Sequence, residues 1–142
     1  MKKITQKELN EIIKKHQMWL NDENGGERAR FNDMNLNGLD LSNSNLEAAY
    51  FCGTDLVHSN LENCNLKSCQ MCYADLSYAN LKNANIQYAD LSSCILINTN
   101  LENCNLYQTT LDVRSLQCKA KLDGVKIYGY VLRKEENNER DS

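Results

Sequence analysis

An apolar residue recurs at every fifth position from residue 31 to residue 116, with no slip in the series. A period of five advances about 140° per step around an α-helix, so no apolar stripe forms there. On a flat strand an odd period sends successive apolar residues to opposite faces. We therefore predict that each five-residue unit is a short strand followed by a corner, and that the chain coils. The series is Phe31, Leu36, Leu41, Leu46, Phe51, Leu56, Leu61, Leu66, Met71, Leu76, Leu81, Ile86, Leu91, Leu96, Leu101, Leu106, Leu111 and Leu116.

The residue two places before each of these apolar positions is almost always small. Residues i and i−2 of a strand point the same way, so both face the interior. A narrow tube has no room for two large side chains on each side, which explains the small residue. Four cysteines fill such inward slots as small apolar residues: Cys64, Cys69, Cys94 and Cys104.

The number of sides follows from a second period of 20 residues. The sequence LENCNL stands at 61–66 and again at 101–106, and asparagines recur at the same interval. Four units per turn would stack these residues in columns, about 4.8 Å apart, where asparagine side chains bond to one another. This spacing favours a square cross-section over a triangular one. The columns are Asn43, Asn63, Asn83 and Asn103; Asn45, Asn65, Asn85 and Asn105; and Asn60, Asn80 and Asn100.

One extra residue interrupts the period near its end. The spacing from Leu116 to Leu122 is six, and Arg114 occupies what should be a small inward slot. A bulge or corner loop explains this insertion, and a functional loop is the alternative.

The N-terminal segment shows a different pattern, because its apolar residues follow the helical rule over residues 5–20. Thr5 and Glu8 form a capping box at its start, and Asn21 to Gly26 is a polar, glycine-ended stop. We expect a helical cap and turn over 1–26, a coil over 27–132 and a charged, disordered tail over 133–142. The large residues Met34 and Leu39 in the first coil would fill space beneath the cap.

Composition narrows the class of protein. The chain has 142 residues, of which 16 are basic and 19 acidic, and its net charge is -3. A protein that binds nucleic acid usually has an excess of basic residues, which this chain lacks. No stretch of about 18 apolar residues predicts a membrane helix, and the first residues do not resemble an export signal. The seven cysteines follow the repeat and not a metal-ligand spacing. We expect a cytoplasmic protein with free thiols.

Several units match the repeat A-(D/N)-L-x-x, among them Ala74-Asp75-Leu76, Ala79-Asn80-Leu81 and Ala89-Asp90-Leu91. The chain thereby resembles the pentapeptide-repeat family. The resemblance implies an all-β solenoid, a right-handed quadrilateral parallel β-helix of about five coils, with an N-terminal α-helical cap. The cap would cover the unpaired edge of the first coil.

Two pairs of outward residues are candidate sites, because each pair lies 20 residues apart and so on neighbouring coils. Cys52 and Cys72 form a surface thiol pair, interpreted as two exposed thiols or as a redox-linked or thiophilic metal site. Asp55 and Asp75 place like charges close together, which solvent and salt, or a bound cation, would relieve.

Aromatic and apolar residues indicate two further candidate surfaces. Tyr73, Tyr78 and Tyr88 stand at outward corners of a single coil, and exposed tyrosines are enriched in protein interfaces, although a tyrosine can also lie flat along its sheet. The final coil has no following helix to cap it, so it could mediate an end-to-end homodimer. Its apolar residues are Val125, Ile127, Tyr130 and Leu132.

Catalysis has little support in the sequence. Neither His16, on the helix, nor His58, at an outward corner, stands in a pattern that would activate a nucleophile. No glycine-rich phosphate loop or zinc motif is present, and we expect no enzyme activity and no cofactor.

The most economical hypothesis is a non-enzymatic scaffold or protein-interaction module whose partner is another protein, with no direct binding of nucleic acid or membrane. The resemblance implies an alternative, since some pentapeptide-repeat proteins mimic DNA and bind DNA gyrase. Five coils would span roughly 24 Å, over which duplex DNA carries about 14 charges. The net charge of -3 argues against this mimicry.

Overall fold

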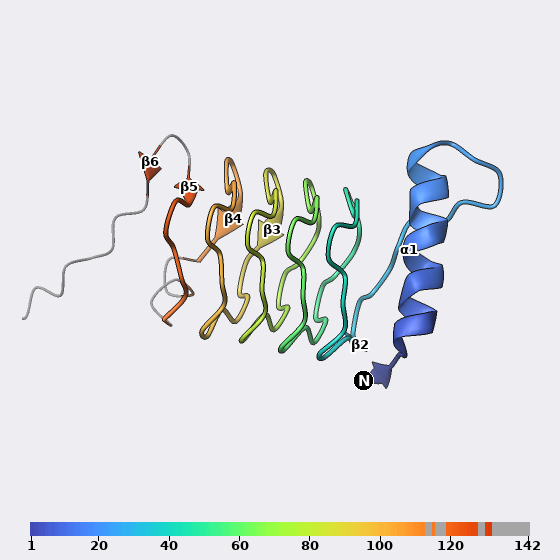
Figure 1. Ribbon diagram of the computed structural model, residues 1–142, viewed down its shortest axis with the longest axis horizontal. Coiled ribbons are helices and arrows are strands. Elements are labelled where there is room, and N and C mark those ends of the chain that lie inside the picture. The colour runs from blue at the N-terminus through green and yellow to red at the C-terminus, as the bar shows by residue number, and fades with distance from the viewer. Residues whose placement is uncertain (113–114, 116–118, 128–129, 132–142) are drawn as a thin grey trace, which may run out of the picture.

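The described residues between Arg30 and Lys126 wind into a stack of four-sided coils (Figure 1). The computed structural model describes residues 1–112, 115, 119–127 and 130–131. Parallel bridges join residues 20 positions, or one turn, apart: Asn45 pairs with Asn65, and Asn65 pairs with Asn85. The predicted pairing period of 20 is therefore confirmed, and with it the square cross-section.

The strands are short because a corner follows each two or three extended residues. Most contacts between coils are single bridges. Continuous pairing forms the parallel pairs β1 (Lys2–Lys3) with β2 (Met34–Asn35) and β3 (Asp90–Leu91) with β4 (Thr110–Leu111). An antiparallel pair, β5 (Lys126–Ile127) with β6 (Tyr130–Val131), lies at the far end of the stack.

The periodic apolar residues fill the interior, as predicted. Leu61, Leu81 and Leu101 are at most 1% exposed, and backbone bonds from the Leu61 and Leu81 N–H groups to the next coil place them in one column. The small inward slots are also buried, among them Ala49, Cys64, Cys69, Ala74, Ala79, Ala84, Ala89, Cys94 and Cys104.

Polar residues in the inward slots have a role that the pattern did not reveal. The Thr99 hydroxyl donates to the Leu76 carbonyl at 2.8 Å, and the Cys104 thiol donates to the Leu81 carbonyl at 2.9 Å. In each case the acceptor is the apolar residue of the previous coil, 23 positions earlier. Threonine and cysteine therefore interchange in this slot because both donate to the same backbone group.

The second residue of each corner adopts a left-handed conformation. Its φ lies between 52° and 63° wherever the residue is not glycine. Asparagine tolerates these dihedral angles. The Asn63 side-chain amide also donates to Asn43 at 3.0 Å, and Asn83 donates to Asn63 at 3.1 Å. The predicted asparagine ladders are thus present.

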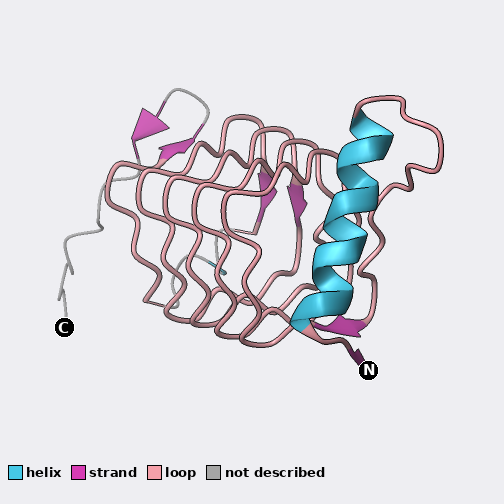
Figure 2. Ribbon diagram, turned by 45° about the vertical axis from the view of Figure 1, so that its right-hand side comes forward, coloured by secondary structure: helices cyan, strands magenta, loops and turns pink. Residues whose placement is uncertain are grey.

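Helix α1 (Gln6–Leu20) covers the first coil (Figure 2). Thr5 is its N-cap, and the Thr5–Glu8 capping box is formed, as predicted. Leu9 is fully buried in the core, while Ile12, Ile13, Met34 and Leu39 pack against it. A β-carbon on Gly26 would overlap the Trp19 backbone, so glycine is required where the chain leaves the helix.

Two contacts at this end were not predicted. The residues before the helix form strand β1, which pairs with β2 and buries Ile4. His16 is fully buried; its Nδ1 accepts the Ala29 N–H at 2.9 Å, so its Nε2 donates to the Glu47 carbonyl at 3.0 Å. This neutral imidazole links the helix to two segments of the coil.

The far end agrees with the predicted insertion. Asn100 pairs with Lys121 and Asn105 with Lys126, a spacing of 21, so one extra residue lies between these coils. Val125 is fully buried and belongs to the core of this chain, which corrects its assignment to an exposed end. Arg114, Leu116, Leu132 and the predicted tail 133–142 lie outside the described residues.

Candidate interaction surface

The corners direct three tyrosines outward, as the sequence predicted. Tyr73, Tyr78 and Tyr88 are 72%, 51% and 48% exposed, and each has φ near 60°. Gly53 and Ser93 occupy the same corner position on the coils before and after Tyr73, and both are small residues. A bulky side chain is uncommon in this backbone conformation, so the tyrosines are not what the corner itself favours.

These tyrosines do not form a single patch. Successive corners of the coil lie five residues apart, so Tyr73 and Tyr78 border the same face. Tyr88 is two corners beyond Tyr78 and therefore lies diagonally opposite to it. The three tyrosines therefore do not share one face: Tyr73 and Tyr78 border one, and Tyr88 lies outside it.

Two isoleucines extend the surface between Tyr73 and Tyr78. Ile95 and Ile97 are 44% and 41% exposed. Ile95 pairs with Asp75, and the Tyr78 N–H donates to the Ile97 carbonyl at 2.8 Å, so both lie on the rung next to this pair. We call Tyr73, Tyr78, Ile95 and Ile97 the apolar face. Ile95 was not identified from the sequence. Its signal was present, because isoleucine stands there in place of the aspartate or asparagine that precedes the leucine in the repeat.

Aromatic contacts hold two of the tyrosine rings. Tyr78 stacks on His58 of the previous coil, with ring centroids 4.9 Å apart. Tyr88 meets Tyr107 edge-to-face at 5.9 Å, and the Lys67 ammonium lies 6.0 Å from the Tyr88 ring. The Tyr78 ring is thereby ordered while half of it stays exposed.

Asp55 and Asp75 are stacked on this face, as predicted. Asp55 accepts hydrogen bonds from the Asn37 side chain at 2.9 Å and from the Val57 N–H at 3.2 Å. Asp75 accepts the Ser77 N–H at 3.0 Å. Each carboxylate accepts at least one hydrogen bond from a neighbouring donor, and both add negative charge beside the apolar residues.

Cys52 and Cys72 lie in the column next to Tyr73. The structure joins them in a disulfide, with their Cα atoms 4.7 Å apart. The structure therefore has a linked pair and not two separate thiols, and a redox or metal role of this pair stays a prediction. The physical reason is the rung spacing, which brings their β-carbons within bonding reach.

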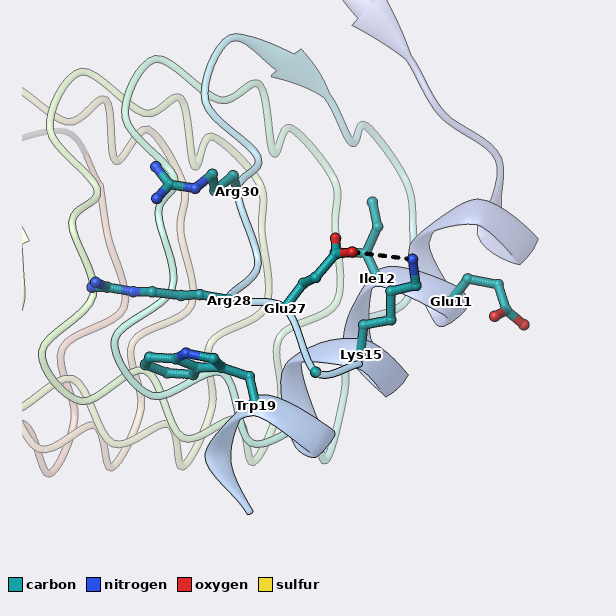
Figure 3. Close-up of a pocket in the computed structure, with 8 residues that line it drawn as sticks. Glu11, Ile12, Lys15, Trp19, Glu27, Arg28 and Arg30 are labelled. Carbon is teal, nitrogen blue, oxygen red and sulfur yellow. Dashed lines mark hydrogen bonds and ion pairs between the residues drawn. The ribbon is translucent and has the colours of Figure 1, made fainter. Parts of the chain in front are cut away.

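A pocket of about 480 Å³ lies between α1 and the first coil (Figure 3). Its walls include Trp19 and Arg28, whose guanidinium lies 5.4 Å from the Trp19 ring and 3.9 Å from the Tyr50 ring. Arg28 also donates to the Tyr50 hydroxyl at 2.6 Å, and Lys15 pairs with Glu27 at 3.5 Å. These side chains are occupied in holding the cap to the coil.

The described residues offer little for metal or acid–base chemistry. No group of three or more histidine, cysteine, aspartate or glutamate side chains among them is arranged to hold a metal ion. His16 is enclosed by backbone partners, and burial lowers its pKa, aided by the Arg28 charge and opposed by the hydrogen bond to Glu47. His58 lies under Tyr78. In the part of the chain that the structure describes, no helix is long and apolar enough to cross a membrane.

A family model described as pentapeptide repeats matches residues 29–67, 44–77 and 74–112, which together cover more than half of the chain. None of the curated proteins matches the chain in sequence.

Solved structures of pentapeptide repeat proteins are similar to this chain. Rfr23 from the cyanobacterium Cyanothece 51142 shares 28% identity, with a TM-score of 0.53 over 66% of this chain and 59% of that protein. HetL from the cyanobacterium Nostoc sp. strain PCC 7120, a protein involved in heterocyst differentiation regulation, shares 23% identity, with a TM-score of 0.50 over 75% of this chain and 59% of that one.

QnrB1, a plasmid-mediated fluoroquinolone resistance protein, shares 20% identity, with a TM-score of 0.41 over 72% of this chain and 59% of that one. This last likeness carries no argument about function. The chain spans 59% of the length of all three proteins. The comparisons agree with a right-handed quadrilateral β-helix, the fold predicted from the repeat.

Proposed function

Because the chain belongs to the pentapeptide repeat family, we propose that it is a protein-interaction module that contacts its partner through the apolar face. Pentapeptide repeat proteins are in general structural or interaction modules. One observation carries the proposal: large apolar side chains, 41% to 72% exposed, gather on one face of a coil whose interior is already filled.

The backbone conformation of Tyr73 and Tyr78 supports an interface. A side chain in the left-handed region costs roughly 1–2 kcal/mol relative to glycine, and asparagine is tolerated better than other residues. Asn63 and Asn83 take the same corner position elsewhere. Tyrosine there is therefore not explained by the stability of the corner, whereas tyrosine is enriched in interfaces.

The rigidity of the coil also favours binding. Ile95 and Ile97 are held by ladder bonds to Leu76 and Tyr78, and Tyr78 is stacked on His58. A surface ordered before binding loses little conformational entropy when a partner arrives. A persistent apolar patch of this kind is typical of an interaction site.

The charges beside the patch suggest the chemistry of the partner. Asp55 and Asp75 lie on the same face, and the Ile95 side chain follows them in the column. We infer a protein partner that presents apolar groups flanked by a basic residue, because a carboxylate pair steers positive charge.

The test compares a double variant, Tyr73→Asn with Tyr78→Asn, with a matched control, Tyr88→Asn, at a corner outside the apolar face. Each protein is used to capture partners from an extract of the cells that make it, and bound proteins are quantified. We expect a partner captured by the wild type and the control to be lost from the double variant, with all three equally folded. Equal capture by all three would refute the proposal.

DNA mimicry is the second candidate, and the charge distribution disfavours it. The column of Ser42, Glu62, Lys82 and Glu102 alternates in charge, and the net charge is -3. A DNA-supercoiling assay with purified gyrase separates the candidates: we expect no inhibition. Inhibition at low micromolar protein would replace the apolar-face proposal with mimicry.

A further inference from the structure

Cys52 and Cys72 differ from the other described cysteines in where they lie. They are partly exposed in an outer column beside the apolar face and are linked to each other across two coils. The remaining four described cysteines are buried in inward slots: Cys64, Cys69, Cys94 and Cys104. The chain therefore separates one surface pair from a set of internal thiols.

The backbone holds this pair together without help from the sulfur bond. The Gly53 N–H donates to the Cys72 carbonyl at 2.9 Å, and the Asp33 N–H donates to the Cys52 carbonyl at 3.1 Å. The Cys52 N–H donates in turn to the Asn32 side chain at 2.9 Å. Equivalent bonds join the other coils, where no disulfide is present between described cysteines. Reduction would leave two thiols facing each other at the same spacing.

The internal cysteines are poor competitors for the same chemistry. The Cys64 thiol donates to the Leu41 carbonyl at 2.9 Å, and the Cys69 thiol donates to the Leu46 carbonyl at 3.0 Å. Burial raises the pKa of Cys64 to about 11 and those of Cys69, Cys94 and Cys104 to about 12. Cys64 and Cys104 share a column, but Ala84 lies between them. These thiols are neither ionised nor paired.

We propose that Cys52 and Cys72 form a reversible redox site that exchanges with small disulfides of the glutathione class. The thiolate of one cysteine attacks a sulfur of the small disulfide, forming a mixed disulfide and releasing one small thiolate. The second cysteine, as thiolate, then attacks the protein sulfur, which forms the Cys52–Cys72 bond and releases the second small thiolate. The protein gives up two electrons, and its two thiol protons pass through solvent to the released thiolates.

This site adds to the proposed interaction module and does not depend on it. The pair borders Tyr73, so its oxidation state decides whether the two coils beside the apolar face are covalently linked. The ladder keeps the fold in both states, and the change is confined to the outer column. Redox exchange can therefore be measured without any binding partner.

The experiment uses the full chain with Cys118→Ser, which removes the one cysteine outside the described residues. The protein is equilibrated in buffers of reduced and oxidised glutathione, quenched with acid, denatured and labelled with a high-mass maleimide. We expect two thiols to disappear together in a single two-electron transition. In such a transition, the ratio of oxidised to reduced protein changes tenfold for about 30 mV of buffer potential. Peptide mapping should assign both to Cys52 and Cys72.

Native labelling gives a second measurement. In the reduced, folded protein, Cys52 and Cys72 should react at least about 100-fold faster than the internal cysteines, because thiolate is the reactive form. Comparable labelling of Cys64 or Cys69 would contradict the proposed selectivity.

Single variants provide the controls. Cys52→Ser should leave Cys72 as a mixed disulfide with glutathione and abolish the paired transition, and Cys72→Ser should do the same for Cys52. Cys94→Thr replaces the thiol donor in its inward slot with a hydroxyl donor and should leave the transition unchanged. A pair that stays oxidised at every buffer ratio would be structural, and one that stays reduced would have no redox role; either result overturns the proposal.

Discussion

The inner and outer surfaces of the same coil obey different rules. Inside, a large apolar residue and a small residue alternate in all units beyond the first coil whose interior is described, and Leu61, Leu81 and Leu101 repeat without change along one column. Outside, equivalent positions hold unlike residues: the column that contains Asp55 and Asp75 continues with Ile95.

The difference shows that fold and recognition use separate residues of each five-residue unit. The interior is closed, so each side chain must match the volume left by its neighbours. An outer residue needs only to tolerate its backbone conformation, and tyrosine, histidine, serine and asparagine all occupy the left-handed corner. The outer surface can therefore change without disturbing the stack.

The sharpest test of this contrast compares adjacent residues, one inside and one outside. Leu81→Ala should lower the free energy of unfolding by roughly 2–5 kcal/mol, because the stacked coil cannot collapse around the cavity. Lys82→Ala, one residue later and facing outward, should change it by less than about 0.5 kcal/mol. Denaturant midpoints measure both. Similar midpoints for the two variants would break the comparison.

His16 tests the end of the inner surface, where the cap closes it. His16→Ala should lower the free energy of unfolding by about 3 kcal/mol, since it leaves the Ala29 N–H and the Glu47 carbonyl without their partner. Thermal melts of the variant and the wild type at neutral pH provide the measurement.

The pH dependence of the same residue sharpens the test. Burial lowers the pKa of His16 in the folded protein below its usual value of 6.5. Its contribution to stability is therefore complete above pH 6.5 and is lost as the pH falls through the lowered pKa. The wild type should lose stability in this range while His16→Ala does not; parallel pH profiles would show that His16 is not buried as the neutral form.

A smaller effect is expected for the polar inward slots. Thr99→Val keeps the shape of the side chain but removes the donor to the Leu76 carbonyl, and should cost about 1 kcal/mol. Thr99→Cys should recover part of the loss, because cysteines make the same contact elsewhere. A Thr99→Val protein as stable as the wild type would mean that the slot selects size alone.

The smallest change in stability is expected on the apolar face. Tyr78→Asn relieves the left-handed corner but loses the stacking on His58, so the two terms offset each other to within about 1 kcal/mol. Chemical denaturation checks this balance. A loss as large as that of Leu81→Ala would show that Tyr78 serves the fold and not an outer surface.

The sequence by itself determined the coil, its four sides and its interior. These follow from the periods of five and 20 residues. Each five-residue unit requires the same strand and corner, and a four-sided coil is the arrangement that meets this requirement in all units at once. The helix boundaries were equally local, because Thr5 and Glu8 specify the helix start within four residues.

Only the tertiary structure decided the contacts between surfaces that the periods leave open. The position of His16 depends on Ala29 and Glu47, which the cap brings together from 13 and 31 residues away. The grouping of Tyr78 with Ile97 likewise depends on which residues meet across a rung. The period of 20 placed Cys52 beside Cys72, but only the structure shows the two sulfurs bonded. The repeat determines that neighbouring coils stack. The contacts between side chains on the outside of the coils depend on individual residues, because neither period constrains which residue stands there.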